Sequence, residues 1–540
     1  MDSLYLVFIG LALVYLMYKN ISVKRKALKI LRDYSSRLGW SKYKIEDLDS
    51  HYLERKDELG KWSLDALTWG DLELSEFLIK TQAFYSSLGA NHIYEAFHYL
   101  ADESTLEWRK KLIDMGDQDR EICITHLYYL GKEDGSNLHF FIRNAGDFFL
   151  PFWLIQGLYY LMILAIISIP FIKAWSLILA GGLIIVNSLI YTSSQEKLRH
   201  ELFNVDYFQK ALKRARLLEK ELSEDLVWYK KELGGNLEAF KGIRVSPLQE
   251  TGESIEFQAF KDISNIFFLK SLRQYARLGH RVKKNRLEAT RLVELLGELE
   301  LALYMKALIA NKAMCQAEFS GDKLLSFEEL YHPVLDEPVG YSRQASKRLL
   351  VTGSNASGKS TFMKSMAISS LFSQVVGYAF AKSFSLSPGR IYTSMALRDS
   401  LEKEESYFVT EIKSLRRIVK ATEEGFCCCF IDEILRGTNT IERIAASSSV
   451  LERLAESDSC IYVATHDIEL TELLSAYENV HFREHYEGSD IVFDYKLLEG
   501  PSDSTNAILL LGIMGFNQEI IGEAQAKVDN FLATKTWRKM

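Results

Sequence analysis

The segment Arg348–Thr361, RLLVTGSNASGKST, constrains the fold of this chain more than any other. A short apolar run, Leu349–Val351, precedes the pattern Gly-x-x-x-x-Gly-Lys-Ser, and a helix-like run, Thr361–Phe372, follows it. A buried strand, a glycine-rich loop and a helix in this order form a phosphate-binding loop, whose backbone N–H groups surround an anion. The alternative is a chance match in a glycine-rich turn, and the strand and helix on either side argue against it.

Within this loop, Lys359 is expected to reach the β- and γ-phosphates, and the Ser360 hydroxyl to ligate Mg²⁺. The helix that follows directs its positive dipole end at the phosphates. We therefore expect ATP and Mg²⁺ as cofactors. The predicted nucleotide-binding residues of the loop are Gly353, Ser354, Asn355, Ala356, Ser357, Gly358, Lys359, Ser360 and Thr361.

A second apolar run, Phe426–Ile431 (FCCCFI), ends in Asp432 and Glu433. A continuous apolar run of this length is typical of a buried parallel strand. Two carboxylates at its end suit a metal site beside the phosphate loop. We expect Asp432 to bind Mg²⁺ and Glu433 to orient and activate the attacking water. The alternative is an acidic helix start that caps the strand.

A third strand-like run, Cys460–Thr465 (CIYVAT), is followed by His466. Polar residues at the carboxyl ends of strands in an α/β sheet lie at the ligand crevice. His466 is therefore a catalytic candidate that hydrogen-bonds the γ-phosphate or the water. Gln374, in the segment after the first helix, is a further candidate for contacting the metal or the water.

A long apolar stretch, Phe148–Tyr191, contains one charged residue, Lys173. At roughly 20 residues for each membrane span, it fits two. We expect transmembrane helices at Phe152–Ile172 and Ala174–Tyr191, joined by a tight turn at Pro170–Lys173.

A shorter apolar run, Leu4–Tyr18, predicts an N-terminal membrane anchor, although a short buried helix is the alternative. Basic residues follow this run and the later apolar stretch, and such residues mark the cytoplasmic side. We therefore expect a multi-pass protein of the inner (cytoplasmic) membrane with both soluble regions in the cytoplasm. The basic residues after the first run are Lys19, Lys24, Arg25, Lys26, Lys29 and Arg32.

The formal net charge of −7 gives no global nucleic-acid signature, so any basic surface must be local. One such feature lies in the helical region Asn265–Met314. Its residues Arg273, Arg277, Arg281 and Lys284 fall on one helix face. This stripe either contacts phosphates of DNA or anionic lipid, or is a solvated face, which is the commoner case. Six cysteines without a C-x-x-C pair predict reduced thiols and no zinc site.

Several of these segments together resemble the MutS family of ATPases. The strong resemblance covers Leu292–Phe531, and a weaker one covers Leu64–Leu100. Three further segments carry it besides the loop: LVELLGELELALYMKALI before the ATPase, EELYHPVL ahead of the loop, and LDALTWGDLEL at the start of the family's helical core. The remaining motifs are DEILRGTNT (Asp432–Thr440), ATHDIELTELL (Ala464–Leu474), SYFVTEI (Ser406–Ile412) and STNAILLLGIMGF (Ser504–Phe516).

This resemblance implies an α/β ABC-type P-loop ATPase domain at the C-terminus, preceded by an α-helical core or lever region and transmembrane helices. It also implies a head-to-tail homodimer that ATP binding closes and hydrolysis reopens. Ser406 matches the signature serine that contacts the γ-phosphate of the partner subunit in trans. His466 matches the switch histidine, and His332 the residue near the base.

The sequence departs from the family pattern in its loop, where Ser354, Ala356 and Ser357 replace the usual proline, methionine and glycine. Before Leu64 we expect neither the mismatch-reading nor the connector domain of the family, and no Phe-x-Glu wedge motif occurs in that stretch. No nuclease-like domain is expected at the C-terminus.

These features and the family resemblance together predict the function. We expect a membrane-anchored MutS-like ATPase that works as a dimeric clamp on mismatched or structured DNA. The alternatives are an ATP-driven membrane scaffold or remodelling protein without DNA and, ranked last, a transporter. The expected domains are an anchor with its basic flank (1–32), a cytoplasmic helical region (33–147), a transmembrane hairpin (148–193), a helical core or lever (194–320) and the ATPase domain (321–540).

Overall fold

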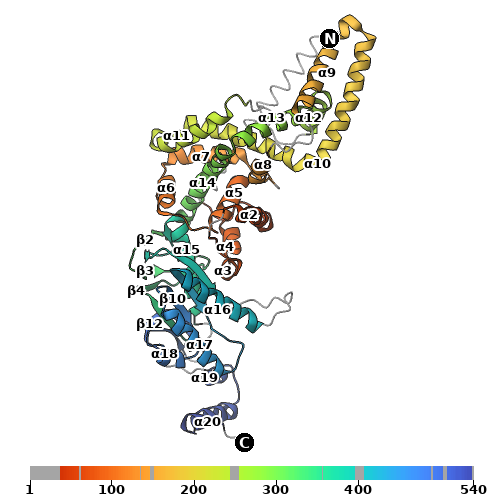
Figure 1. The fold of residues 1–540 in the computed structure, drawn as a ribbon. Coiled ribbons are helices and arrows are strands. Elements are labelled where there is room, and N and C mark those ends of the chain that lie inside the picture. The colour runs from red at the N-terminus through yellow and green to blue at the C-terminus, as the bar shows by residue number, and fades with distance from the viewer. Residues whose placement is uncertain are drawn as a thin grey trace. The chain divides into compact units, whose positions relative to one another are not determined.

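The chain folds into two compact units, each built from several chain segments (Figure 1). The first unit comprises Met1–Lys61, Leu78–Ala96 and Glu107–Asn311, and the second comprises Trp62–Phe77, Phe97–Leu106 and Lys312–Met540. The predicted anchor Leu4–Tyr18 lies outside the described residues. The computed structural model describes residues 37–59, 62–133, 136–145, 151–243, 255–354, 357–395, 407–487, 490–502, 507–534 and 536–537.

The first unit is helical in the part of the chain that the structure describes. Up to residue 311, α3 (Ala66–Asp71) and the first residues of α4 (Leu74–Thr81) and α6 (Glu103–Ile113) belong to the second unit. The other helices are α2 (Ile45–Leu59), α5 (Ser87–Ala96), α7 (Asp117–Leu130), α8 (Leu138–Asn144), α9 (Phe152–Ile172), α10 (Ala174–Glu221), α11 (Val227–Leu237), α12 (Ile255–Phe268), α13 (Lys270–Lys284) and α14 (Arg286–Asn311), with single turns at Glu224–Leu226 and Glu238–Phe240.

Helix α14 is the core of this unit, and it crosses α5 at close range. Glycine makes this crossing possible from both sides. A Cβ atom on Gly89 would lie 2.0 Å from Cδ of Glu300, and one on Gly297 would lie 2.3 Å from the His92 ring. Because neither distance is tolerable between heavy atoms, a larger residue at either position would have to displace the Glu300 carboxyl group or the His92 ring.

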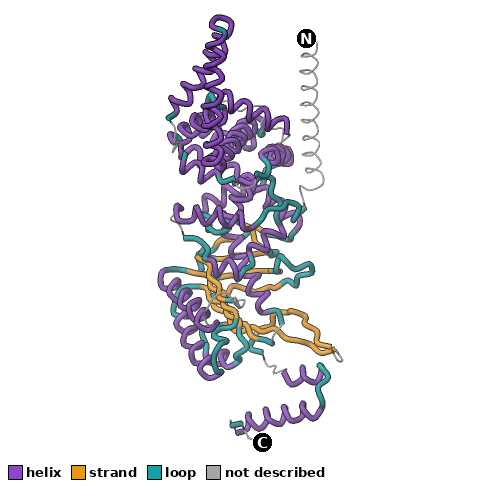
Figure 2. Tube along the Cα trace, turned by 90° about the vertical axis from the view of Figure 1, so that its right-hand side faces the viewer, coloured by secondary structure: helices purple, strands orange, loops and turns teal. Residues whose placement is uncertain are grey.

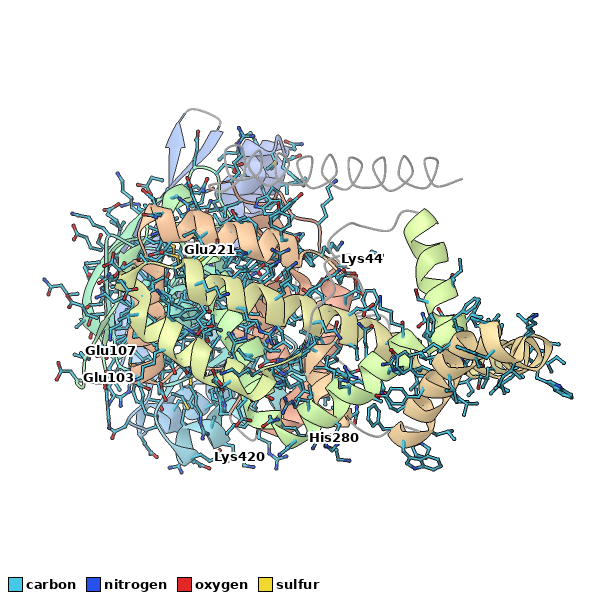
Figure 3. All side chains as sticks on the ribbon, turned by 90° about the horizontal axis from the view of Figure 1, so that it is seen from above. Lys44, Glu103, Glu107, Glu221, His280 and Lys420 are labelled. Carbon is cyan, nitrogen blue, oxygen red and sulfur yellow. The ribbon has the colours of Figure 1, made fainter. Side chains whose placement is uncertain are left out.

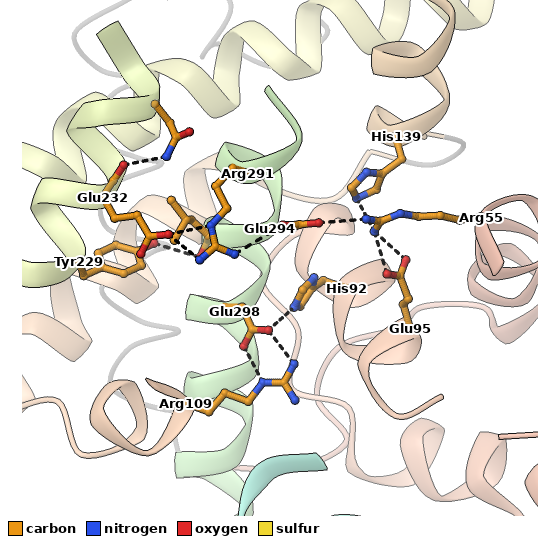
Figure 4. Close-up of polar contacts among 12 residues, drawn as sticks. Arg55, His92, Glu95, Arg109, His139, Tyr229, Glu232, Arg291, Glu294 and Glu298 are labelled. Carbon is orange, nitrogen blue, oxygen red and sulfur yellow. Dashed lines mark hydrogen bonds and ion pairs between the residues drawn. The ribbon is translucent and has the colours of Figure 1, made fainter. Parts of the chain in front are cut away.

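Buried ion pairs connect α14 to the helices around it (Figure 4). Arg55 of α2 donates to Glu95 of α5 at 2.8 and 2.9 Å and to Glu294 of α14 at 3.1 Å. Arg109 of α6 donates to both carboxylate oxygens of Glu298, at 2.8 and 2.6 Å. Burial acts to raise the pKa of Glu298, but the Arg109 guanidinium outweighs it and holds that pKa far below its usual range. The charges therefore fix the helices in one register.

Two apolar helices, α9 and the first part of α10, form an antiparallel hairpin that projects from this unit (Figure 1). The segments Phe152–Ile172 and Ala174–Ser194 are long and apolar enough to cross a membrane, by length and composition alone. Only 17% and 28% of them are buried, which is unlike the core helices of a soluble protein.

The first helix of the hairpin has the predicted bounds, and the second is longer than predicted. Helix α10 does not end at Tyr191 but continues to Glu221, with one kink at Leu198. No proline or glycine lies between Leu183 and Glu221, so nothing in the backbone ends the helix there.

The second unit contains the β-strands, drawn in orange in Figure 2. A six-stranded sheet has the order β12-β11-β5-β10-β9-β8, parallel except for β12. The strands are β1 (Cys315–Gln316), β2 (Glu318–Phe319), β3 (Leu325–Leu330), β4 (Tyr341–Ser346), β5 (Arg348–Thr352), β6 (Tyr378–Ala379), β7 (Ser383–Leu386), β8 (Arg390–Ser394), β9 (Cys427–Asp432), β10 (Cys460–Ala464), β11 (Glu478–Glu487) and β12 (Asp490–Glu499).

The remaining strands form a four-stranded sheet, β2-β7-β3-β4, and a β1–β6 pair. This confirms the predicted α/β fold of the C-terminal region, which follows a mainly helical part. The helices of this region are α15 (Lys359–Val376), α16 (Tyr407–Glu424), α17 (Thr440–Ala455), α18 (Glu469–Leu473), α19 (Ala507–Ile513) and α20 (Gln518–Thr534).

The segment Trp62–Phe77 packs in the second unit, not in the helical core where the family resemblance placed it. Asp71, at the end of α3, accepts hydrogen bonds from the Thr393 hydroxyl at 2.6 Å and from the Met395 N–H at 3.0 Å. The Trp62 indole donates to the Tyr392 hydroxyl at 3.0 Å. These contacts attach the segment to the edge strand β8.

Glu300 of α14 is a fully buried carboxyl group whose pKa is raised to about 7 by burial. It accepts hydrogen bonds from the backbone N–H groups of Tyr85 and Ser86, at 2.6 and 2.9 Å, and lies 2.5 Å from the Ser86 hydroxyl. These bonds lower the pKa, but less than burial raises it. The folded protein therefore keeps the Glu300 carboxyl group protonated up to about pH 7.

We predict that Glu300→Gln removes a pH dependence of stability. Because the folded-state pKa lies above the ordinary value of 4.5, the folded protein holds the extra proton. Wild-type stability should fall as the pH rises from about 4.5 through 7, by on the order of 3 kcal/mol in total. Thermal unfolding at several pH values measures it. Glu103→Gln, at an exposed site (Figure 3), is the control and should leave the dependence unchanged. An unaltered pH profile in Glu300→Gln would contradict the prediction.

Candidate nucleotide-binding site

Three neighbouring parallel strands bring the predicted site residues to one edge of the sheet. Strand β10 pairs with β5 on one side and β9 on the other, so that Ala464 lies opposite both Val351 and Asp432. The phosphate loop follows β5, Glu433 follows β9, and His466 follows β10 after one further residue. The carboxyl ends of all three strands therefore meet at the same crevice, where ligands bind in open α/β sheets.

The backbone of the phosphate loop requires its two glycines. Gly353 has φ 141° and Gly358 has φ 106°, a region that favours glycine. A Cβ atom on Gly353 would also lie 2.8 Å from the Phe482 carbonyl oxygen. Gly358 directly precedes α15, whose N-terminus thus opens onto the loop.

The Lys359 ammonium lies at the centre of this loop. Its Nζ donates to the carbonyl oxygens of Gly353 and Ser354, at 2.8 and 2.7 Å, and lies 3.3 Å from Nδ1 of His466. The side chain is 4% exposed. A cation in this position can transfer its hydrogen bonds from the loop carbonyls to phosphate oxygens.

His466 connects Lys359 to Glu433. Its Nε2 lies 2.5 Å from Oε1 of Glu433. Burial, followed by the nearby Lys359 charge, lowers the pKa of His466, so the ring is neutral. Nδ1 lies within hydrogen-bond distance of both the Lys359 ammonium, which can only donate, and the Gly353 carbonyl oxygen at 3.2 Å, which can only accept. On the other side of the ring, Nε2 faces the Glu433 carboxylate. Glu433 itself has φ 57° and its N–H donates to the Ala464 carbonyl at 2.8 Å, which turns its side chain to the crevice.

Asp432 provides a test of whether the residues fit a magnesium ion. Its side chain is 5% exposed, and the buried Oδ1 atom has no hydrogen-bond partner. Leaving a carboxylate oxygen unpaired is costly unless a ligand satisfies it. Asp432 and the exposed Ser360 line the same pocket of about 430 Å³, and both offer the oxygen ligands that Mg²⁺ prefers. The donor set therefore fits Mg²⁺.

A second pocket, of about 450 Å³, lies over the loop and has the size of a small-molecule site. It contains Lys359 and Glu433 and extends past the aromatic rings of Tyr341 and Tyr495. Its lining residues are Leu335, Asp336, Glu337, Val339, Tyr341, Ser357, Gly358, Lys359, Ser360, Thr361, Glu433 and Tyr495.

Two predicted residues that the structure describes, His332 and Gln374, do not line this site. His332 is half-buried and does not line the pocket over the loop, although Leu335, Asp336, Glu337 and Val339, which follow it closely, do. Asn355, Ala356 and Ser406 lie outside the described residues. Gln374 does not contact the metal or the water as expected. It lies 15 positions after Lys359 on the same helix, which is about 22 Å along the helix axis. Its Oε1 accepts the Gly389 N–H at 2.8 Å, so the amide serves the fold and not a metal.

The segment Trp62–Phe77 contributes residues to the site that no sequence pattern predicted. Asp71 and Glu73 line the pocket that contains Ser360 and Asp432, and Glu73 pairs with Lys364 of α15 at 3.0 Å. Glu73 and Lys364 are 291 positions apart, and no local pattern records such a contact. Tyr495, on β12, was missed for the same reason.

Comparison with known proteins identifies the domain that this site belongs to. Residues 349–532 match MutS domain V. MutS domain V is an ABC-type ATPase domain, so the match confirms the expected resemblance for this region. It also implies ATP as the ligand of the loop.

Several curated proteins that match this region are named DNA mismatch repair protein MutS. The one from Pseudothermotoga lettingae is 30% identical over 251 residues, which are 44% of this chain and 31% of that protein. Those from Staphylococcus haemolyticus and Thermus aquaticus are each 28% identical, over 48% and 47% of this chain and 31% and 32% of their own length. The chain thus spans about a third of the length of the relatives it matches.

Proposed function

We propose that this protein is a membrane-anchored MutS-like ATPase that hydrolyses ATP with Mg²⁺ and uses the cycle to close and open a homodimeric clamp on DNA. The observation that carries the ATPase proposal is the contact chain from Lys359 through His466 to Glu433, beside the unpaired Oδ1 of Asp432. Charge, base and metal ligand lie together at one edge of the sheet.

Each side chain has a distinct part in the proposed hydrolysis. Lys359 binds the phosphates and compensates their negative charge. Glu433 holds the attacking water and accepts its proton. His466 orients the Glu433 carboxylate through the contact at its Nε2 and faces the γ-phosphate from β10. Asp432 and Ser360 would hold Mg²⁺, which supplies positive charge to the phosphates when bound.

The proposed homodimer depends on Ser406, which is expected to complete the ATP site of the partner subunit. Ser406 lies outside the described residues, but in the sequence it comes directly before Tyr407, where α16 begins. A serine next to a helix start is suited to bind an anion together with the helix dipole. By family resemblance it contacts the γ-phosphate bound in the partner subunit, with His332 near the base. One subunit would then hold an incomplete site.

The membrane part of the proposal rests on the α9–α10 hairpin. Each apolar segment has 21 residues, which gives about 31 Å of helix and matches the roughly 30 Å hydrocarbon core. Trp153 and Trp175, near opposite ends of the hairpin, are 72% and 75% exposed. Tryptophan favours the two membrane interfaces. We propose that the hairpin inserts into the inner membrane with both soluble regions in the cytoplasm.

The proposal that DNA is the substrate rests on the relatives, which are named DNA mismatch repair proteins. This chain matches about a third of the length of each. A second candidate is an ATP-driven membrane scaffold or remodelling protein that binds no DNA, and the exposed hairpin favours it.

For the catalytic residues, we predict that Lys359→Ala abolishes hydrolysis and weakens ATP binding, because the loop loses its cation. Glu433→Gln should keep ATP binding and lower turnover by roughly 10²- to 10⁴-fold, because the amide cannot accept the proton. Phosphate release and fluorescent-nucleotide titration measure the two effects. Glu452→Gln, at an exposed position of α17, is the matched control. Wild-type turnover in Glu433→Gln would exclude its role as base.

For the dimer, we predict that mixing inactive Ser406→Arg and Glu433→Gln subunits restores part of the ATPase activity. If sites are shared in trans, each mixed dimer has one site with both defects and one intact site. The specific rate of the wild-type protein should also rise with its concentration. A rate independent of concentration, together with no rescue, would defeat the shared-site arrangement.

For the hairpin, we predict that Leu164→Glu with Ile167→Glu releases the protein from neutral vesicles in flotation assays. Both side chains are more than 60% exposed, and a charge within the bilayer costs about 2.5–3.5 kcal/mol. Leu53→Glu with Ile79→Glu, at exposed apolar positions of α2 and α4, is the matched control and should still float. Equal flotation of both variants would argue against insertion.

For the substrate, we predict that the full-length protein binds duplex DNA with an affinity that falls steeply with salt, since phosphate contacts release counterions. Fluorescence anisotropy with and without ATP measures this. Absence of binding at low salt in both nucleotide states would reject the DNA clamp and leave the membrane scaffold.

A further inference from the structure

Helix α13 presents a strongly basic face to solvent. Its 15 residues, KSLRQYARLGHRVKK, include six lysines and arginines and no acidic residue. Leu272, Tyr275, Leu278 and Val282 are buried on the opposite side, so packing fixes which face is outward. The exposed residues of the helix are Arg277, His280, Arg281, Lys283 and Lys284, and Figure 3 labels His280 among them.

Nothing in the described part of the chain neutralises the three main charges of this face. Arg277, Arg281 and Lys284 form no ion pair with any described carboxylate. Arg281 instead donates to the Lys241 backbone carbonyl at 3.0 Å, which holds its guanidinium in place without removing charge. By contrast, Arg291 on the next helix pairs with Glu232 at 2.5 Å. The face is therefore suited to an anionic partner.

Helix α13 begins at the base of the apolar hairpin. The Arg273 guanidinium lies over the Tyr159 ring, 3.2 Å from its centre, and its Nε donates to Oε1 of Gln156 at 3.3 Å. Gln156 and Tyr159 occupy the first two turns of α9. Along the same face of α13, Arg277 follows one turn after Arg273, and Arg281 follows a turn later.

Helix α12 holds this junction against the other arm of the hairpin. The Asn187 amide donates to the Phe267 carbonyl at 2.9 Å, and the Tyr191 hydroxyl donates to Asp262 at 2.8 Å. Phe268 packs on a small apolar cluster inside the hairpin. Contacts with both arms therefore fix α12 and α13 to the hairpin base. Figure 1 shows the two helices next to this base.

We propose that the outward face of α13, formed by Arg277, Arg281 and Lys284, binds the phosphate groups of anionic lipids beside the point where the hairpin enters the bilayer. This rests on the proposed insertion of the hairpin. Arg277 and Arg281 lie about 6 and 12 Å along the helix from Arg273, comparable to the range over which the surface potential of anionic lipids acts. Guanidinium groups bind phosphate oxygens in a bidentate manner.

Duplex DNA carries phosphates too, but the structure favours lipid. The contacts of Arg273, Asn187 and Tyr191 place the basic face at the hairpin base, where headgroups surround an inserted hairpin. A DNA duplex on this face would have to lie in that same headgroup layer, whose anionic lipids repel it.

The test is flotation of the full-length protein with vesicles of phosphatidylcholine alone or of three parts phosphatidylcholine to one part phosphatidylglycerol. Wild-type protein should bind both, and bind the anionic vesicles more tightly in a manner that salt weakens. The triple variant Arg277→Gln, Arg281→Gln, Lys284→Gln should lose the anionic preference, by roughly fivefold in partition coefficient for each charge. Glutamine keeps helix propensity, and circular dichroism checks the fold.

The matched control removes three cations with similar helical spacing from exposed positions of α16: Lys413→Gln, Arg416→Gln, Lys420→Gln. It should retain the preference for anionic vesicles. If both variants lost the preference for anionic vesicles equally, the effect would come from net charge alone, and the proposal would be overturned.

Other outcomes separate this proposal from the one it rests on. Equal binding of wild-type protein to both vesicle types would overturn headgroup recognition and leave insertion intact. Binding to neither would overturn insertion, and with it this proposal. A triple variant that keeps its anionic preference but loses duplex DNA binding would assign the face to DNA instead.

Discussion

The main-chain hydrogen bonds that hold β10 between β5 and β9 are the interaction on which the candidate site depends. They align three strand ends whose residues are far apart in sequence, so that Lys359, His466 and Glu433 form one chain of contacts. The left-handed backbone at Glu433 then directs its carboxylate to the crevice. Without this pairing, the same residues would be ordinary surface groups of a sheet.

The helical unit has a different basis. Two glycines permit α5 and α14 to cross closely, and buried ion pairs from Arg55 and Arg109 fix the register of that crossing. Helix α10 continues from this packed region into the apolar hairpin without interruption except for the kink at Leu198. The hairpin is thus continuous with the core of its unit, and α12 and α13 brace its base. An apolar hairpin and a basic helix face are the two features that a bilayer surface would recognise.

Local sequence patterns were enough to predict which residues follow the strands of the site and where the first hairpin helix lies. Lys359, Asp432, Glu433 and His466 each follow a strand-like run, and the carboxyl ends of parallel strands necessarily meet at one edge. The first hairpin helix was also predicted, because a long apolar run bounded by polar residues defines its own length. These predictions needed only spacing and chemistry along a short stretch of chain.

The failures concern contacts that spacing does not record. Gln374 follows the loop closely in sequence, yet the rise of an intact helix carries it about 22 Å away. Glu73 lies 291 positions from Lys364, and only tertiary packing places them in contact.

The measurement that tests the central claim most directly is Mn²⁺ binding, by electron paramagnetic resonance, in the presence of a non-hydrolysable ATP analogue. We predict nucleotide-dependent Mn²⁺ binding that Asp432→Asn weakens strongly while the analogue still binds. Unchanged Mn²⁺ binding in Asp432→Asn would contradict the site described above.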